Sequence, residues 1–338
     1  MTTTELLNET SELDVRSVES PAPSEHVAHH FDSAQQQFDA CKLGMWLFLV
    51  TEVLFFSGLF VAYAVYRANH PEVFVNAHKY LNTILGAFNT IVLLVSSLTM
   101  AWAVRSAQLE QKRLLVWLLG ITLSCASLFL GVKAVEYSHK WGKGLLWASA
   151  YEATAAAAPE VEQIVSHTHQ ALFVLSTPAM AVLALSTVLC VAMYVRKRHV
   201  GFGFSAWVLA SSVAFFGGVG IGQVVEHFSH GSHGHTTHES HAVAESHDTS
   251  HNATTVTPEE DAEAKRITGV FFSIYYVMTG VHAVHILCGM GVIAWLLWRA
   301  IQHDFNRHNF GPVDFVGLYW HLVDLVWIYL FPLLYLIR

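Results

Sequence analysis

The chain of 338 residues is 53% hydrophobic and only 13% charged, with a formal net charge of −8 at pH 7. A water-soluble domain carries about a quarter charged residues, so this composition excludes an ordinary soluble globular protein and indicates a membrane protein. The acidic balance predicts no nucleic-acid partner. The four cysteines form no C-x-x-C pair and no zinc or copper spacing, so they are interpreted as small buried residues.

A polar segment precedes the first long apolar run. Residues 1–40 hold eight acidic residues and a single basic one, Arg16. Such a composition cannot bury enough apolar surface to offset the entropy of ordering it. A polar, disordered N-terminal tail is therefore predicted for residues 1–40.

The first long apolar run, Leu43–Tyr66, contains one charged residue, Glu52. A helix of this length reaches ~36 Å, enough to cross a hydrocarbon core of ~30 Å. A charge near the middle of a membrane span is costly, so the Glu52 side chain is expected to face protein, water or a polar ligand, or to be protonated. Glu52 is the first functional candidate, and an interhelical hydrogen bond without any chemistry is the alternative.

The second span, Leu81–Val104, carries no charge. Three polar residues recur along it at intervals of seven: Asn82, Asn89 and Ser96. Small and polar side chains favour close contact between helices in lipid, so these residues are interpreted as helix-packing positions.

The third span, Leu114–Ser138, carries Lys133 and Glu136 near its far end. At a spacing of three residues these side chains are expected either to pair on one helix face or to reach the interface separately. Glu136 is the stronger functional candidate, because a lysine can extend to water by itself.

A polar, alanine-rich stretch at 140–165 leads to a fourth span, Gln170–Val195, and a fifth, Gly203–Val225. A short basic turn at 196–199 joins the two, which predicts a transmembrane hairpin.

The segment 229–265 is acidic and rich in histidine. Histidine tracts of this kind can collect Zn²⁺ or Cu²⁺. The secondary metal-ligand candidates are His230, His233, His235 and His238. A solvated loop that holds no metal is the favoured interpretation.

The sixth apolar run, Ile267–Trp298, is long enough that its helix must tilt or extend beyond the bilayer. It carries His282 and His285, which lie one turn apart on one face. The seventh span, Val313–Ile337, carries His321 and Asp324 at the same spacing, and the carboxylate is expected to orient the imidazole.

Basic residues follow the second, fourth and sixth spans, in the loops at 105–113, 196–198 and 299–307. The positive-inside rule places these loops in the cytoplasm. The sequence therefore predicts an all-α, polytopic transmembrane helix bundle of seven spans, with a cytoplasmic N-terminus and a periplasmic C-terminus.

Six polar or ionisable side chains within the spans are expected to face the protein interior: Glu52, Glu136, His282, His285, His321 and Asp324. Histidines that form hydrogen bonds where helices meet are the favoured interpretation, and ligation of haem or another metal is the alternative. A proton-coupled transporter that uses Glu52 and Glu136 as relays is a further alternative, but the sequence shows no internal repeat.

At these positions the chain resembles subunit III of the haem–copper oxidases. The resemblance rests on LGMWLFLVTEVLFFSGLF and LNT, on EYSH after the third span, on TGVHAVHILCGMG in the sixth, and on YWHLVDLVWIYLFPLLYL at the end. It covers residues 41–139 and 266–337.

The resemblance implies an accessory subunit of a proton-pumping terminal oxidase, multi-pass in the bacterial inner membrane, with no redox metal of its own. Haem and copper would belong to partner subunits, namely the catalytic subunit I together with subunit II. This chain would bind subunit I, hold phospholipid in a cleft between helix groups, support proton uptake, and possess no catalytic residue. Further respiratory-chain proteins are possible partners, and a quinol-oxidising enzyme is the alternative to a cytochrome c oxidase.

The same resemblance assigns roles to particular residues. Glu52 and Glu136 match the intramembrane glutamates of the family, and the two histidines of the sixth span match its H-x-x-H stretch. The W-H-x-x-D-x-x-W motif corresponds to Trp320, His321, Asp324 and Trp327, of which the two tryptophans are expected at a subunit or helix contact.

The chain departs from the common seven-helix form, which has two helices ahead of the glutamate helix. The core is therefore assigned to residues 41–139 and 266–338. An inserted loop and hairpin at 140–228 and a periplasmic His-rich loop at 229–265 separate its two parts.

Overall fold

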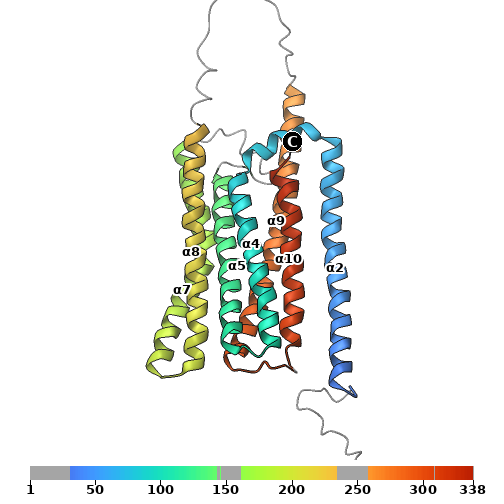
Figure 1. Ribbon diagram of the computed structural model, residues 1–338. Helices are drawn as coiled ribbons and strands as arrows, with labels where there is room; N and C mark the ends of the chain where they lie inside the picture. The colour runs from blue at the N-terminus through green and yellow to red at the C-terminus, as the bar shows by residue number, and fades with distance from the viewer. Residues whose placement is uncertain (1–30, 143–144, 146–160, 234–257, 308, 338) are drawn as a thin grey trace, which may run out of the picture. The chain divides into compact units, whose positions relative to one another are not determined.

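The computed structural model describes residues 31–142, 145, 161–233, 258–307 and 309–337 (Figure 1). All of the secondary structure in these ranges is helical, which confirms the all-α prediction. Seven of the described helices are long and apolar enough to cross a membrane, so the chain is a multi-pass membrane protein.

The helices follow one another with short connections. They are α2 (Ala34–Asn69), α3 (Pro71–Ala77), the 3-10 turn η1 (His78–Tyr80), α4 (Thr83–Gln108), α5 (Lys112–Gly142), α7 (Val161–Val195), α8 (His199–His233), α9 (Pro258–Ile301) and α10 (Gly311–Tyr335). Each predicted span lies within one of the seven long helices, apart from the last two residues of the seventh.

The helices are longer than the apolar runs, and three predicted boundaries change. The prediction of a disordered tail was wrong for residues 34–40, because the Ser33 hydroxyl accepts the Gln36 N–H (3.2 Å) and caps the start of α2. Helices α8 and α9 extend into the predicted loop at 229–265 from either side. Residues 1–30 and 234–257, with most of 140–165, lie outside the described residues.

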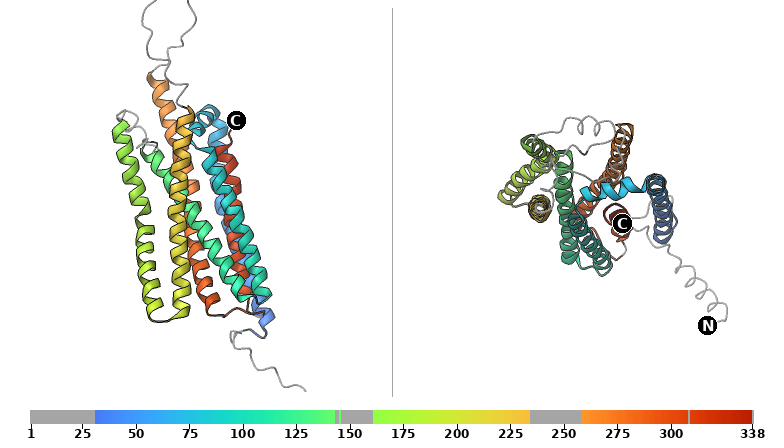
Figure 2. Two further views of the ribbon diagram at one scale, coloured as in Figure 1. Left: turned by 60° about the vertical axis from the view of Figure 1, so that its left-hand side comes forward. Right: turned by 90° about the horizontal axis from the view of Figure 1, so that it is seen from above.

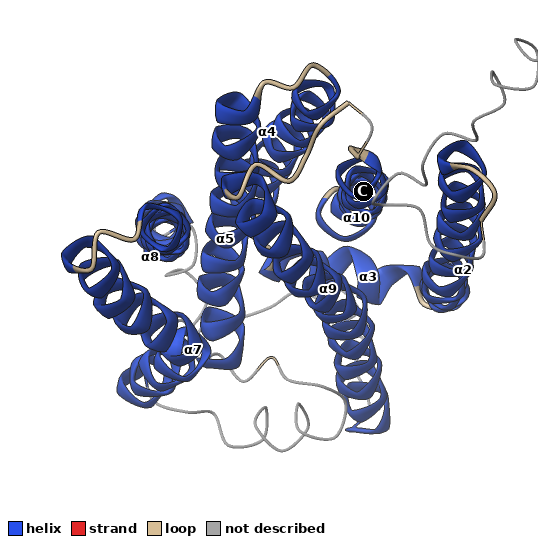
Figure 3. Ribbon diagram, turned by 90° about the horizontal axis from the view of Figure 1, so that it is seen from below, coloured by secondary structure: helices blue, strands red, loops and turns tan. Residues whose placement is uncertain are grey.

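Residues 1–48 and 49–338 are separate compact units, and the packing below concerns the second. Within it α5 is the central helix: 61% of the middle of α5 is buried, compared with 6% of α7. Helix α5 packs against α4 and α9 and also against α7 and α8, whereas α10 packs against α4 and α9 (Figures 2 and 3).

The hairpin is joined to α5 by unusually close backbone contact. A Cβ atom on Gly131 would lie 2.1 Å from the carbonyl oxygen of Phe215, and one on Gly218 would lie 2.3 Å from that of Leu128. Only glycine allows two helices in lipid to approach this closely. The hairpin is therefore an integral part of the bundle.

Large side chains fill the other side of α5, among them Phe129, Tyr275, Trp320 and Trp327, all fully buried. The cysteines are a correction to the sequence analysis. Cys41 and Cys288 are exposed and Cys125 and Cys190 are half-buried, because the outward faces of helices in lipid are as apolar as their interiors.

Candidate functional site

A buried ionic cluster surrounds Glu136 of α5. One carboxylate oxygen accepts hydrogen bonds from Lys140 Nζ (2.6 Å), from the Tyr275 hydroxyl (3.0 Å) and from the Tyr335 hydroxyl, and the other accepts one from Lys133 Nζ (2.7 Å). The lysines lie three residues before and four after Glu136, so they share its face of the helix. Helices α9 and α10 supply the two tyrosines.

The expected Lys133–Glu136 pair is thus present, but the expectation that a lysine here reaches water was wrong. Lys133 is 5% exposed and Lys140 is 3% exposed. Each ammonium group also lies 4.5 Å from the centre of an aromatic ring, that of Trp327 for Lys133 and that of Tyr275 for Lys140. These contacts replace part of the lost hydration.

Sequence reasoning missed three members of this cluster: Lys140, Tyr275 and Tyr335. The signal for Lys140 was present, because it stands four residues after Glu136. No local signal places the two tyrosines there, since each comes from a distant helix.

The hairpin adds a second carboxylate beside the cluster. Glu226 of α8 accepts a hydrogen bond from Asn82 Nδ2 (2.9 Å) and shares with Lys140 and Glu136 the lining of a cavity of about 10 Å³. That volume is enough for about one water molecule. Two lysines and two glutamates therefore meet where α5, α8 and the start of α4 adjoin. Asn82 also caps α4, accepting from the N–H groups of Ile84 and Leu85.

A second polar site joins α2 to α9. His285 Nε2 lies 2.9 Å from Glu52 Oε2, and His285 Nδ1 lies 2.8 Å from the carbonyl oxygen of Val281. A carbonyl oxygen can only accept, so Nδ1 carries a proton. The Glu52–His285 contact then requires one more proton, on Nε2 or on the carboxyl group, and the pair is electrically neutral in both cases. Neutrality makes the glutamate tolerable within a membrane span.

His282 does not join this pair, although the two histidines lie one turn apart on α9. It is fully buried, stacked on Trp327 with ring centres 5.3 Å apart and in edge contact with Phe129 at 5.8 Å. Neither of its nitrogens has a hydrogen-bond partner among the described residues. His282 and His285 therefore contact different helices.

The predicted pairing of His321 with Asp324 was wrong. His321 Nδ1 lies 2.7 Å from the Ser97 hydroxyl of α4. Asp324 is 2% exposed, and its oxygens have no hydrogen-bond partner that meets the distance and angle limits in the described part of the chain. The rotation of α10 that brings His321 to α4 turns Asp324 into the bundle.

Both tryptophans of the W-H-x-x-D-x-x-W motif donate to α4. The Trp320 indole N–H donates to Ser96 Oγ (2.9 Å), and that of Trp327 donates to Thr90 Oγ1 (3.1 Å). Asn89, also fully buried, has no partner for its amide among the described residues. Ser96 and Asn89 thus lie in the α4 contact that their spacing predicted, and Ser96 receives a specific hydrogen bond.

Metal-ligand geometry is absent from the described residues, which contain no group of three or more His, Cys, Asp or Glu side chains able to hold an ion. His235 and His238 lie outside the described residues, as do the side chains of His230 and His233.

Comparison with known proteins adds to this geometry. The family model described as "Cytochrome c oxidase subunit III" matches residues 23–213 and 256–337. The match includes α7 and the first part of α8, and it omits the segment that carries Glu226.

Individual relatives align over shorter segments. Cytochrome c oxidase subunit 3 of Synechocystis sp. is 46% identical over 72 residues, 21% of this chain and 30% of that protein. The subunit 3 of Thermostichus vulcanus is 39% identical over 71 residues, 21% and 35% of the two chains. A probable quinol oxidase subunit 3 of Staphylococcus haemolyticus is 35% identical over 69 residues, 20% and 34%. The chain thus aligns with about a third of each relative's length.

Proposed function

The chain belongs to the cytochrome c oxidase subunit III family, and we propose that it is the accessory subunit III of a proton-pumping haem–copper terminal oxidase. In this proposal oxygen is reduced by partner subunits that hold haem and copper, the catalytic subunit I and subunit II. The chain itself binds no redox metal and carries no catalytic residue. It stabilises subunit I, binds phospholipid and supports proton uptake.

One observation carries the proposal most directly. The residues that match the family motifs come from four separate helices, and within residues 49–338 they converge in one bundle. Glu52 contacts His285 at 2.9 Å, and Trp320 donates to α4 at 2.9 Å. Contacts between motif residues so far apart in sequence support a shared tertiary architecture with the family.

The Glu52–His285 pair supports a part in proton uptake. Its side chains are 19% and 18% exposed, so the pair lies at the margin of the bundle. It holds one exchangeable proton between a carboxyl group and an imidazole, groups that commonly bind and release protons in membrane proteins. In the proposal this pair lies beside the proton route of subunit I and is not part of the chemistry.

The proposed location is the bacterial inner membrane, with the basic turns at 105–113, 196–198 and 299–307 in the cytoplasm. The structure brings two of these turns together, since the Arg307 N–H donates to Glu110 Oε1 at 3.0 Å. That contact supports one common side for both turns.

Co-purification tests the assignment. The tagged full-length chain should be isolated in mild detergent from membranes of its own host, with an untagged strain as control. We expect haem absorption and copper in amounts stoichiometric with the chain. A stable, folded chain that purifies free of haem and copper from membranes rich in oxidase would contradict the proposal.

The relative named as a quinol oxidase subunit keeps a second electron donor in view. The purified complex should be supplied in turn with reduced cytochrome c and with a quinol. We expect turnover with cytochrome c, and turnover with quinol alone would assign the complex to the second class.

A further inference from the structure

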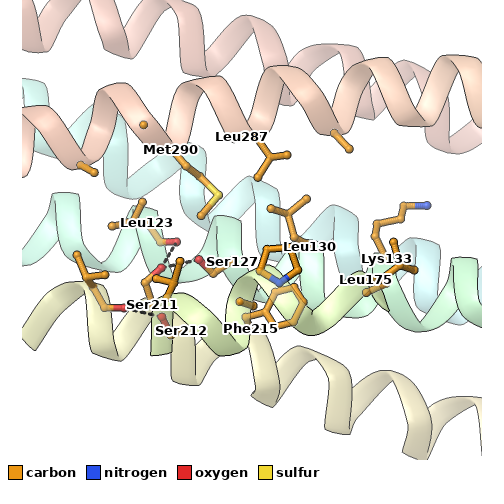
Figure 4. Close-up of a pocket in the computed structure, with 18 of the residues that line it drawn as sticks. Leu123, Ser127, Leu130, Lys133, Leu175, Ser211, Ser212, Phe215, Leu287 and Met290 are labelled. Atoms are coloured by element: carbon orange, nitrogen blue, oxygen red, sulfur yellow. Dashed lines mark hydrogen bonds between the residues drawn. The ribbon is translucent and has the colours of Figure 1, made fainter. Parts of the chain in front are cut away.

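A cavity of about 500 Å³ lies between the α7–α8 hairpin and helices α5 and α9 (Figure 4). Its lining is predominantly apolar and includes Leu130 of α5, Leu175 of α7, Phe215 of α8, and Leu287 and Met290 of α9. The volume falls in the range of ligand pockets. Well-packed protein leaves few voids larger than a water molecule, so the cavity calls for an occupant.

The polar side chains that border the cavity are already satisfied. The Ser127 and Ser211 hydroxyls bond to each other at 2.5 Å, and Ser211 and Ser212 reach backbone carbonyls at 3.3 and 3.0 Å. Lys133 contacts Glu136 at 2.7 Å, and the Tyr137 hydroxyl contacts a threonine of α9 at 2.6 Å. A polar ligand would find no unpaired donor among these groups, which favours an apolar occupant.

The cavity has the shape and place of an acyl chain. Its lining spans residues 123–137 of α5 and 283–294 of α9, about 20 Å and 17 Å along the helix axes. Both stretches lie in membrane-spanning segments. Helix α7 packs extensively on α5 and α8, and α9 packs on α5, so the side between α7 and α9 is the one that extensive helix packing does not close.

Charge selects the leaflet. The exposed turn 196–198 at one end of the hairpin is entirely basic, whereas Glu226 lies toward the other end of α8. An anionic phosphate group is therefore favoured at the basic turn. Along α8 the first lining residue, Val208, stands ten residues after Arg198, a distance of ~15 Å, which equals one half of a ~30 Å hydrocarbon core.

We propose that this cavity binds an acyl chain of an anionic membrane phospholipid whose phosphate lies at the basic turn 196–198. The proposal deepens the proposed binding of phospholipid and gives it a site built by the hairpin. It depends on membrane placement and not on the partners, so the isolated full-length chain can test it even if the oxidase assignment fails.

The test uses the full-length chain in nanodiscs that contain phosphatidylglycerol with a photoreactive group near the end of one acyl chain. Illumination followed by peptide mass analysis should locate cross-links at Leu175–Val182 and at Met290. The result that would overturn the proposal is labelling confined to outward-facing residues such as Val188, which is 65% exposed.

A blocking variant and a matched control sharpen the result. Gly291 lines the cavity, and a Cβ atom there would meet no atom within 4 Å, so Gly291→Leu places a side chain in the open space. Gly280 of the same helix also has no atom within 4 Å and does not line the cavity, so Gly280→Leu is the control. We expect cavity cross-links to disappear in Gly291→Leu and to persist in Gly280→Leu.

Ala179→Leu, which enters from α7, should give the same loss and guards against misfolding of one variant. Replacing Arg196, Lys197 and Arg198 by glutamine should remove the preference for phosphatidylglycerol over phosphatidylcholine while cavity labelling remains. Unchanged labelling in both blocking variants, or a retained isoprenoid quinone in place of phospholipid by mass, would refute the proposal.

Discussion

Replacing Glu136 with glutamine should destabilise the protein far more than removing a single neutral hydrogen bond. The carboxylate is the shared partner of Lys133 and Lys140, at 2.7 and 2.6 Å, and all three side chains are at most 6% exposed. Breaking a buried ion pair by removing one partner costs ~3–5 kcal/mol, because it leaves a buried charge uncompensated. Glu136→Gln leaves two such charges, so we expect a loss at the upper end of this range.

A matched series separates charge from hydrogen bonding. Tyr275→Phe removes one donor to the carboxylate and should cost about 1.5–3 kcal/mol. Replacing Lys133 and Lys140 by methionine together with Glu136→Gln removes every charge of the α5 cluster, and it should recover much of the lost stability. Tyr335→Phe should resemble Tyr275→Phe, since its hydroxyl donates to the same oxygen.

Thermal unfolding of the purified chain in mild detergent measures these differences. On the scale of soluble domains, a loss of several kcal/mol lowers the melting temperature on the order of 10 °C. We expect a decrease of this size for Glu136→Gln and a smaller one for the charge-free triple variant. A Glu136→Gln protein that melts at the wild-type temperature would refute the argument that this carboxylate balances both lysines.

Three further predictions concern helix contacts. Gly131→Leu should separate the hairpin from α5 and lower the melting temperature strongly, because even a Cβ would lie 2.1 Å from a carbonyl oxygen of α8, whereas Gly217→Leu meets no atom within 4 Å and should be nearly neutral. Glu52→Gln should preserve assembly and initial oxygen turnover of the complex, since an amide N–H can donate to the unprotonated Nε2 of His285, and Glu52→Leu should release the histidine, which infrared spectra of labelled imidazole would detect. Trp320→Phe should lower stability by about 1 kcal/mol through loss of its indole hydrogen bond, and an unchanged melting curve would show that this bond contributes nothing.

The sequence by itself determined the class of this protein and the course of its chain. Apolar runs longer than a bilayer is thick can satisfy their backbone only as helices, so each span could be located without any tertiary information. Relations within one helix were also readable. The pairing of Lys133 with Glu136 follows from the spacing along α5, because the helical period fixes which side chains share a face.

Relations between helices were decided by the tertiary structure alone. The period of α10 places His321 and Asp324 on one face, but the rotation of that helix against α4 gave the histidine to Ser97 and left the carboxylate without it. The period of α9 likewise does not reveal that His285 meets Glu52 of α2. In lipid the outward and inward faces of a helix are almost equally apolar, so hydropathy sets no rotation. Close packing and the pairing of buried polar groups set it instead, and both depend on residues far apart in the chain.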